Sequence, residues 1–121
     1  MDLTGIKVME NMDLPLEINC ASVQTMRTAA DDFLLLDCRE QSEYDLVHLD
    51  GSHLLPMSEI QQRLNELEPY QSKSIIVYCH LGGRSLQVTQ WLRHQGFMKA
   101  QSMAGGIDAW SVEIDSSLSR Y

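Results

Sequence analysis

Two apolar runs are the clearest pattern in the chain, one over residues 33–36 and one in the segment 74–79, where it follows Ser74. Runs of this length without polar interruption are typical of strands that are buried on both faces of a parallel sheet. Shorter segments with strand character lie at residues 16–18, 51–56 and 100–103. The pattern therefore predicts strands of a covered sheet, spread along the whole length of the chain.

Helix-like spacing occupies the intervals between these strands. The most regular case is residues 58–69, where Ile60, Leu64 and Leu67 repeat at i, i+4 and i+7. Ser58 and Gln61 have the spacing of a capping box, and a proline follows at position 69, so we predict an amphipathic helix here. Further helices are predicted at residues 21–30, 42–49, 84–96 and 105–113.

Strands that alternate with helices indicate βαβ units, and hence an α/β fold with a mostly parallel sheet and helices on both faces. In such folds, ligands bind at the carboxyl ends of the strands. Asp37 and Arg39 follow one apolar run and Cys79 ends the other, so this edge holds the candidate chemistry. We expect an N-terminal arm over residues 1–15 and a single domain over residues 16–121.

Composition and charge narrow the function. The chain has 121 residues and a net charge of −8, which argues against nucleic acid as a partner because phosphate binding needs a basic face. The apolar runs are far too short to span a membrane, and the first residues lack the features of a secretory signal. The three cysteines form no CxxC pair, and no metal-ligand spacing occurs. We expect a cytoplasmic protein with reduced thiols, without a metal or cofactor and without a membrane partner.

The segment VYCHLGGRS, residues 77–85, carries the strongest chemical signal. It places Cys79 between a predicted strand and a predicted helix, whose first N–H groups attract negative charge. Gly82 and Gly83 allow the backbone amides to converge on one point, and Arg84 adds a permanent positive charge. These features favour a thiolate nucleophile, whereas the alternative is an ordinary turn beside a buried cysteine.

Four segments in order resemble the rhodanese-like domain, the sulfurtransferase family. They are LLLDCRE followed by SEY, then HLDGSHLLP, IIVYCHLGGRS and MAGGIDAW, which lie between residues 33 and 110. The resemblance implies a five-stranded parallel sheet and a Cys79 that carries a sulfane sulfur as a persulfide. The implied donor is thiosulfate or a protein persulfide, and the implied acceptor is cyanide, a thiol or a sulfur-carrier protein.

The same resemblance suggests roles for individual residues. We expect Asp37 to support the site structurally. Two interpretations fit Arg39: it pairs with a carboxylate and supports the structure, or it lies at the mouth of the site. The expected substrate-binding residues are His80, Leu81, Gly82, Gly83, Arg84, Ser85 and Arg39. For Cys38, core packing is the simplest interpretation, with a second thiol that captures an oxidised Cys79 as the alternative.

Two other functions fit parts of this pattern. Cysteine phosphatases also place a cysteine and an arginine in a loop before a helix, but they carry five residues between the two. Here four residues separate Cys79 from Arg84, and the shorter loop suits a single sulfur better than a phosphoryl group. A non-catalytic rhodanese-like binding module is the remaining alternative, in which Cys79 would be incidental.

Overall fold

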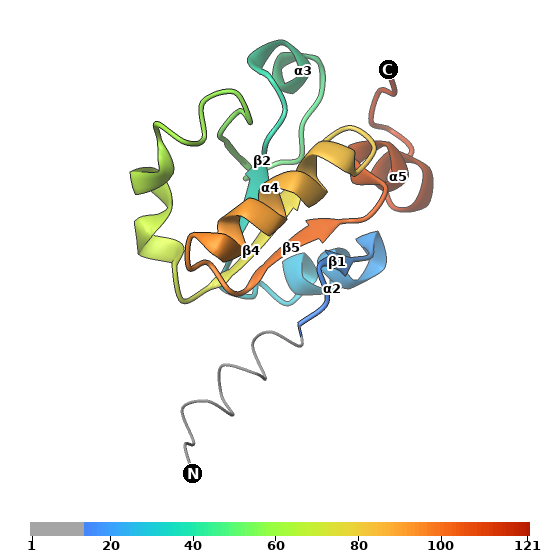
Figure 1. The fold of residues 1–121 in the computed structure, drawn as a ribbon. Helices are drawn as coiled ribbons and strands as arrows, with labels where there is room; N and C mark the ends of the chain where they lie inside the picture. Colours follow the sequence, from blue (N-terminus) through green and yellow to red (C-terminus); the bar gives the residue numbers. More distant parts are fainter. Residues whose placement is uncertain (1–13) are drawn as a thin grey trace.

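The computed structural model describes residues 14–121, and Figure 1 shows its fold. The strands are β1 (Glu17–Ile18), β2 (Phe33–Asp37), β3 (His53–Leu54), β4 (Ser74–Tyr78) and β5 (Ala100–Met103). The helices are α2 (Cys20–Thr28), α3 (Gln41–Leu46), α4 (Gly83–His94) and α5 (Gly106–Glu113), and η1 (Leu64–Tyr70) is a 3-10 helix.

The predicted N-terminal arm, residues 1–15, lies outside the described residues except for its last two. The carbonyl groups of Leu14 and Pro15 each accept a hydrogen bond of 2.8 Å from the guanidinium of Arg93, on α4. These bonds attach the start of the described chain to the helix that follows the apolar strand β4.

The five strands form one sheet in the order β1-β5-β4-β2-β3, and every pairing is parallel. The α/β class with a parallel sheet is thus confirmed. The two apolar runs become the neighbouring strands β2 and β4, which pair over their whole length from Phe33 with Ser74 to Asp37 with Tyr78. The carboxyl ends of both strands therefore meet at the same edge.

Helices cover both faces of the sheet, which explains why β2 and β4 have no polar face (Figure 1). Alternate residues point to opposite sides, so Leu36 and Val77 pack under α4 while Leu35 and Ile76 pack under α2 and α5. Each face thus has its own buried cluster, and the sheet is fixed between two helical layers.

The amphipathic helix predicted over residues 58–69 is not formed. Turns occupy the first part of this segment, and the 3-10 helix η1 runs through Pro69 to Tyr70. The hydroxyl of Ser58 does not cap a helix but donates to the Glu40 carboxylate at 2.9 Å and 3.1 Å. Ile60 and Leu67 are still buried, so the apolar spacing identified the core side chains but not the tighter backbone that places them there.

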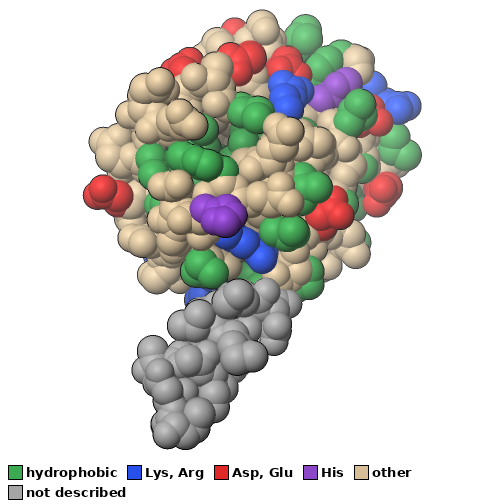
Figure 2. Space-filling model, in the orientation of Figure 1, with side chains coloured by type: hydrophobic (Ala, Val, Ile, Leu, Met, Phe, Trp, Pro, Cys, Tyr) green, Lys and Arg blue, Asp and Glu red, His purple; other side chains and the backbone are tan. Residues whose placement is uncertain are grey.

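The surface carries its negative charge in more than one region. In the face shown in Figure 2, several Asp and Glu side chains lie near one another along the upper edge, and the others lie singly among hydrophobic and uncharged side chains. Among residues 14–121, no helix is long and apolar enough to cross a membrane.

Candidate active site

Cys79 is the first residue after β4, at the carboxyl edge of the sheet, and its side chain is buried. Its Sγ accepts hydrogen bonds from two backbone N–H groups, that of Gly82 at 3.1 Å and that of Ser85 at 3.3 Å. The Ser85 hydroxyl lies 3.4 Å from the same sulfur. Two amide donors and one hydroxyl thus surround the sulfur, in the arrangement of an anion cradle.

The loop owes its shape mainly to the first of its two glycines. Gly82 has φ +109°, in the left-handed region, and forms the N-cap of α4. A side chain there would also press on the backbone nitrogen of Gly105, at 3.2 Å. Gly83 has open space around it and an ordinary φ, so the turn does not depend on it in the same way.

A second glycine pair holds the outside of the loop. Gly105 and Gly106 begin α5, whose first free N–H groups donate to loop carbonyls: Ile107 to Cys79 at 2.9 Å and Asp108 to His80 at 3.1 Å. A side chain at Gly106 would overlap both carbonyl oxygens. The start of α5 therefore fixes the carbonyl groups of Cys79 and His80 by hydrogen bonds. The sequence predicts only that a helix begins at this glycine pair, and not its contact with the loop of Cys79.

The surroundings of Cys79 stabilise its thiolate. They lower the pKa of Cys79 to about 4 through a hydrogen bond from the Cys38 thiol, the Ser85 hydroxyl and the amides of Ser85 and Gly82, against the opposing effect of burial. The same contact and burial raise the pKa of Cys38 far above its ordinary range. These contacts favour the thiolate form of Cys79 and the protonated form of Cys38.

Arg84 is paired rather than free. Its two terminal nitrogens bind the Glu43 carboxylate of α3 at 2.7 Å and 2.9 Å, and this contact helps to lower the pKa of Glu43 to about 2. The pair ties α3 to the start of α4 at the edge of the loop. Sequence reasoning did not single out Glu43, because the two partners are 41 positions apart.

Asp37 and Arg39 form a buried ion pair with both side chains fully enclosed. The guanidinium of Arg39 donates to both carboxylate oxygens of Asp37, at 2.9 Å and 2.7 Å, and to the carbonyl of Val47 at 2.6 Å. The hydroxyl of Tyr78 adds a bond of 2.9 Å to Asp37. Asp37 thus has the supporting contacts that the sequence suggests. Arg39 shares them, and its side chain is fully buried.

The ring of His80 lies at the outer side of the loop, stacked on Tyr121 with the ring centroids 4.0 Å apart. The Tyr121 hydroxyl accepts from Arg39 and donates to Glu43, both at 2.8 Å. Leu81 is the most exposed side chain of the loop, with 64% of its surface accessible. The tail of the chain therefore contacts the site, although its sequence shows no periodic pattern.

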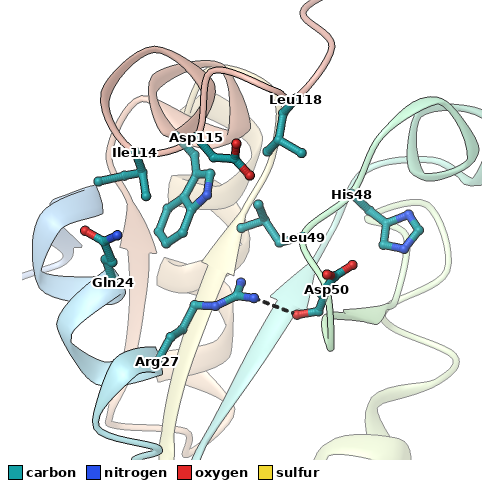
Figure 3. A pocket seen from close by; sticks show the side chains of 9 residues that line it. Gln24, Arg27, His48, Leu49, Asp50, Ile114, Asp115 and Leu118 are labelled. Atoms are coloured by element: carbon teal, nitrogen blue, oxygen red, sulfur yellow. Dashed lines mark hydrogen bonds between the residues drawn. The ribbon is translucent and has the colours of Figure 1, made fainter.

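A separate cavity of about 320 Å³ lies beside α2 and α5 (Figure 3). Arg27 reaches across it and donates to the carbonyl of Asp50 at 2.9 Å, with its guanidinium 5.5 Å from the centre of the Trp110 ring. None of residues 79–85 lines this cavity, so it is distinct from the thiolate site.

Comparison with known proteins agrees with this fold. The sequence model of the rhodanese-like domain family matches residues 21–113. This chain therefore belongs to that family. The resemblance read from the sequence is thereby confirmed.

Individual relatives support the same assignment. The chain is 35% identical over 95 residues to the rhodanese-like/PpiC domain-containing protein 12 of Arabidopsis thaliana. The matched region covers 75% of this chain and 31% of the Arabidopsis protein. It is 28% identical over 109 residues to the adenylyltransferase and sulfurtransferase MOCS3-2 of Zea mays, and this match covers 86% of the present chain and 23% of the Zea mays protein. The chain thus spans less than a third of these curated relatives.

Solved structures match over most of the chain. A rhodanese-related protein from Thermoplasma volcanium has a TM-score of 0.73 and 28% identity, with 83% of this chain and 94% of that chain covered. The human single-domain sulfurtransferase TSTD1 has a TM-score of 0.71 and covers 82% and 97%, and its 22% identity supports the shared fold alone.

Proposed function

We propose that this protein is a sulfurtransferase that carries a sulfane sulfur on Cys79 as a persulfide. The single observation that supports this best is the cradle around Cys79, in which two backbone amides and one hydroxyl face the sulfur. Such donors stabilise an anion without having to protonate it. A thiolate and a terminal persulfide sulfur are both anions of this kind.

In the first half-reaction, the Cys79 thiolate attacks the outer sulfur of thiosulfate or of a persulfide donor. The sulfur–sulfur bond of the donor breaks, and sulfite or a thiolate leaves with the electron pair. Gly82 and Ser85 hold the Cys79 sulfur in place before the attack. The same donors can stabilise the negative charge after it has moved to the new terminal sulfur.

In the second half-reaction, cyanide or an acceptor thiolate attacks the terminal sulfur, and Cys79 leaves as a thiolate. The lowered pKa of Cys79, about 4, makes it a good leaving group in this step. The same environment thus serves both half-reactions. The acceptor we propose is a thiol or sulfur-carrier protein, in a reducing compartment such as the cytoplasm where Cys79 stays unoxidised.

The pairing of Arg84 separates this proposal from a phosphatase. A phosphatase loop needs its arginine to bind the phosphoryl oxygens, whereas here both terminal nitrogens of Arg84 bind Glu43. Together with the four-residue spacing from Cys79 to Arg84, this favours sulfur transfer. Hydrolysis of a phosphate ester that depends on Cys79 would overturn the assignment.

The test is steady-state transfer from thiosulfate to cyanide, measured as thiocyanate, with both substrates varied. We expect parallel double-reciprocal lines, as a covalent intermediate requires. Cys79→Ser is expected to abolish the transfer. Cys20→Ser is the matched control, since Cys20 is also buried but lies in α2 on the other face of the sheet.

A low-molecular-weight persulfide should replace thiosulfate in the same assay. Failure of both donors with a folded wild-type protein would refute the proposal. Transfer that survives in Cys79→Ser would also refute it, and would favour a different nucleophile.

A further inference from the structure

Cys38 lies directly beside Cys79 at the carboxyl edge of the sheet. The ladder between β2 and β4 ends with Asp37 opposite Tyr78, and the next backbone N–H, that of Cys38, donates to the Tyr78 carbonyl at 3.1 Å. Cys38 and Cys79 are therefore the next pair of positions in the same parallel register. They come from strands that are neighbours in space although 41 positions apart in the chain.

Both cysteines point to the same face of the sheet. Cys38 follows Leu36 and Cys79 follows Val77 at the two-residue repeat of a strand, and all four belong to the buried cluster under α4. Their side chains have 0% and 1% of their surface exposed. The third cysteine, Cys20, belongs to the cluster on the opposite face.

The spacing suits a covalent bond between the two. Neighbouring strands lie about 4.8 Å apart, and disulfides join Cα atoms separated by roughly 4.4–6.8 Å. Both side chains belong to the same buried cluster, so the two sulfur atoms lie on one side of the sheet, and the Cys38 thiol is the largest cause of the lowered pKa of Cys79. The spacing of neighbouring strands therefore lies within the range that a disulfide can bridge.

We propose that Cys38 is a resolving thiol, which captures Cys79 as a reversible Cys38–Cys79 disulfide when a hydroperoxide oxidises Cys79. The thiolate that suits Cys79 to sulfur transfer also makes it the sulfur most open to oxidation. The disulfide prevents further oxidation to sulfinic and sulfonic acid, at the cost of activity until a dithiol reduces it.

The steps balance with hydrogen peroxide as the oxidant. The Cys79 thiolate attacks one peroxide oxygen, the O–O bond breaks, and hydroxide leaves; the sulfur has lost two electrons and is a sulfenic acid. The Cys38 sulfur then attacks the Cys79 sulfur, and the S–O bond breaks. The leaving hydroxyl takes the Cys38 proton and departs as water. A dithiol reductant later restores both thiols and is itself oxidised to a disulfide.

The experiment exposes the reduced full chain to hydrogen peroxide without reductant, followed by intact-mass analysis and a non-reducing peptide map. For wild type we expect the loss of two hydrogen atoms, the loss of two of the three thiols, and one cross-linked peptide pair that contains Cys38 and Cys79. Dithiothreitol should restore all thiols. This readout needs no sulfur transfer, so it is independent of the proposed function.

Variants separate a resolving thiol from a bystander. In Cys38→Ser and Cys38→Ala, Cys79 should gain two or three oxygen atoms that dithiothreitol does not remove. Cys20→Ser should behave as wild type. The proposal is overturned if wild type gains these oxygens as readily as the Cys38 variants, or if its cross-link joins Cys20 or a second chain. The wild-type map decides this even if both Cys38 variants fail to fold.

Discussion

Replacing Ser85 with alanine tests how the cradle keeps Cys79 ionised. The Ser85 hydroxyl lies 3.4 Å from the Cys79 sulfur and 2.7 Å from the hydroxyl of Ser102, and both serines are buried. The Ser85 hydroxyl also donates to the Gly82 carbonyl at 3.1 Å, so that carbonyl and the thiolate compete for its single proton when Ser102 donates to Ser85. Ser85→Ala removes this donor and leaves the two backbone amides in place.

The structure sets the expected size of the effect. A hydrogen bond to a charged group contributes about 1.5–3 kcal/mol, and one pKa unit corresponds to about 1.4 kcal/mol. The pKa of Cys79, about 4 in the wild type, should therefore rise by about one to two units in the variant. At pH 7 the sulfur stays ionised in both proteins, but at pH 5 the thiolate fraction should fall by about two- to tenfold.

The assay is the rate of iodoacetamide alkylation of Cys79 as a function of pH, followed by intact mass in a Cys20→Ser background. Because the pKa is lowered, the wild-type rate should be constant above about pH 5 and fall as the pH drops through about 4. Ser111→Ala is the matched control, since Ser111 is also buried but donates to Asp108. A Ser85→Ala midpoint equal to that of wild type would refute the role of the hydroxyl. A wild-type midpoint near 8.5 would refute the whole cradle.

Three further substitutions probe the support of the site. Gly106→Ala should lower the free energy of unfolding by more than about 3 kcal/mol in urea titrations, because the new side chain overlaps the loop carbonyls. Gly51 also has a left-handed backbone but lies in open space, so Gly51→Ala should lower the free energy of unfolding by only about 1 kcal/mol. Glu43→Gln should lower the KM for thiosulfate about two- to fivefold with little change in kcat, because it releases Arg84 and removes a negative charge; an unchanged KM would contradict this. Asp37→Asn should cost about 3–5 kcal/mol of stability, measured by urea unfolding, because it leaves a buried guanidinium without its counterion, and a cost below about 1 kcal/mol would show that the pair is dispensable.

The elements that position Cys79 could be predicted from the sequence because their signals are local. The two apolar runs became β2 and β4, and the residues after Cys79 formed a turn and a helix start. The helix predicted over residues 58–69 was wrong because turns and a 3-10 helix can bury residues at i, i+4 and i+7 as well as an α-helix can. Local spacing thus identifies buried positions more securely than it identifies the backbone between them.

Most side-chain partners of the site could not be predicted, because each contact joins segments far apart in the chain, and sequence reasoning offered Cys38 as a partner of Cys79 only as an alternative. Glu43 on α3 binds Arg84 at the start of α4, and Cys38 lies beside Cys79 because β2 pairs with β4. The sequence does not state that β2 and β4 are neighbours, and this strand order is what brings the thiols together. The stacking of Tyr121 on His80 has no periodic signal at all.

The most direct test of the account is the intact mass of the reduced protein after incubation, without oxygen, with thiosulfate or with a low-molecular-weight persulfide. Wild type and Cys20→Ser should each gain the mass of one sulfur atom, located on Cys79 by peptide mapping and lost again on addition of cyanide. Cys79→Ser should gain nothing. A wild-type protein that is folded and fully reduced, yet takes up no sulfur from either donor, would contradict the claim that Cys79 is a sulfur acceptor.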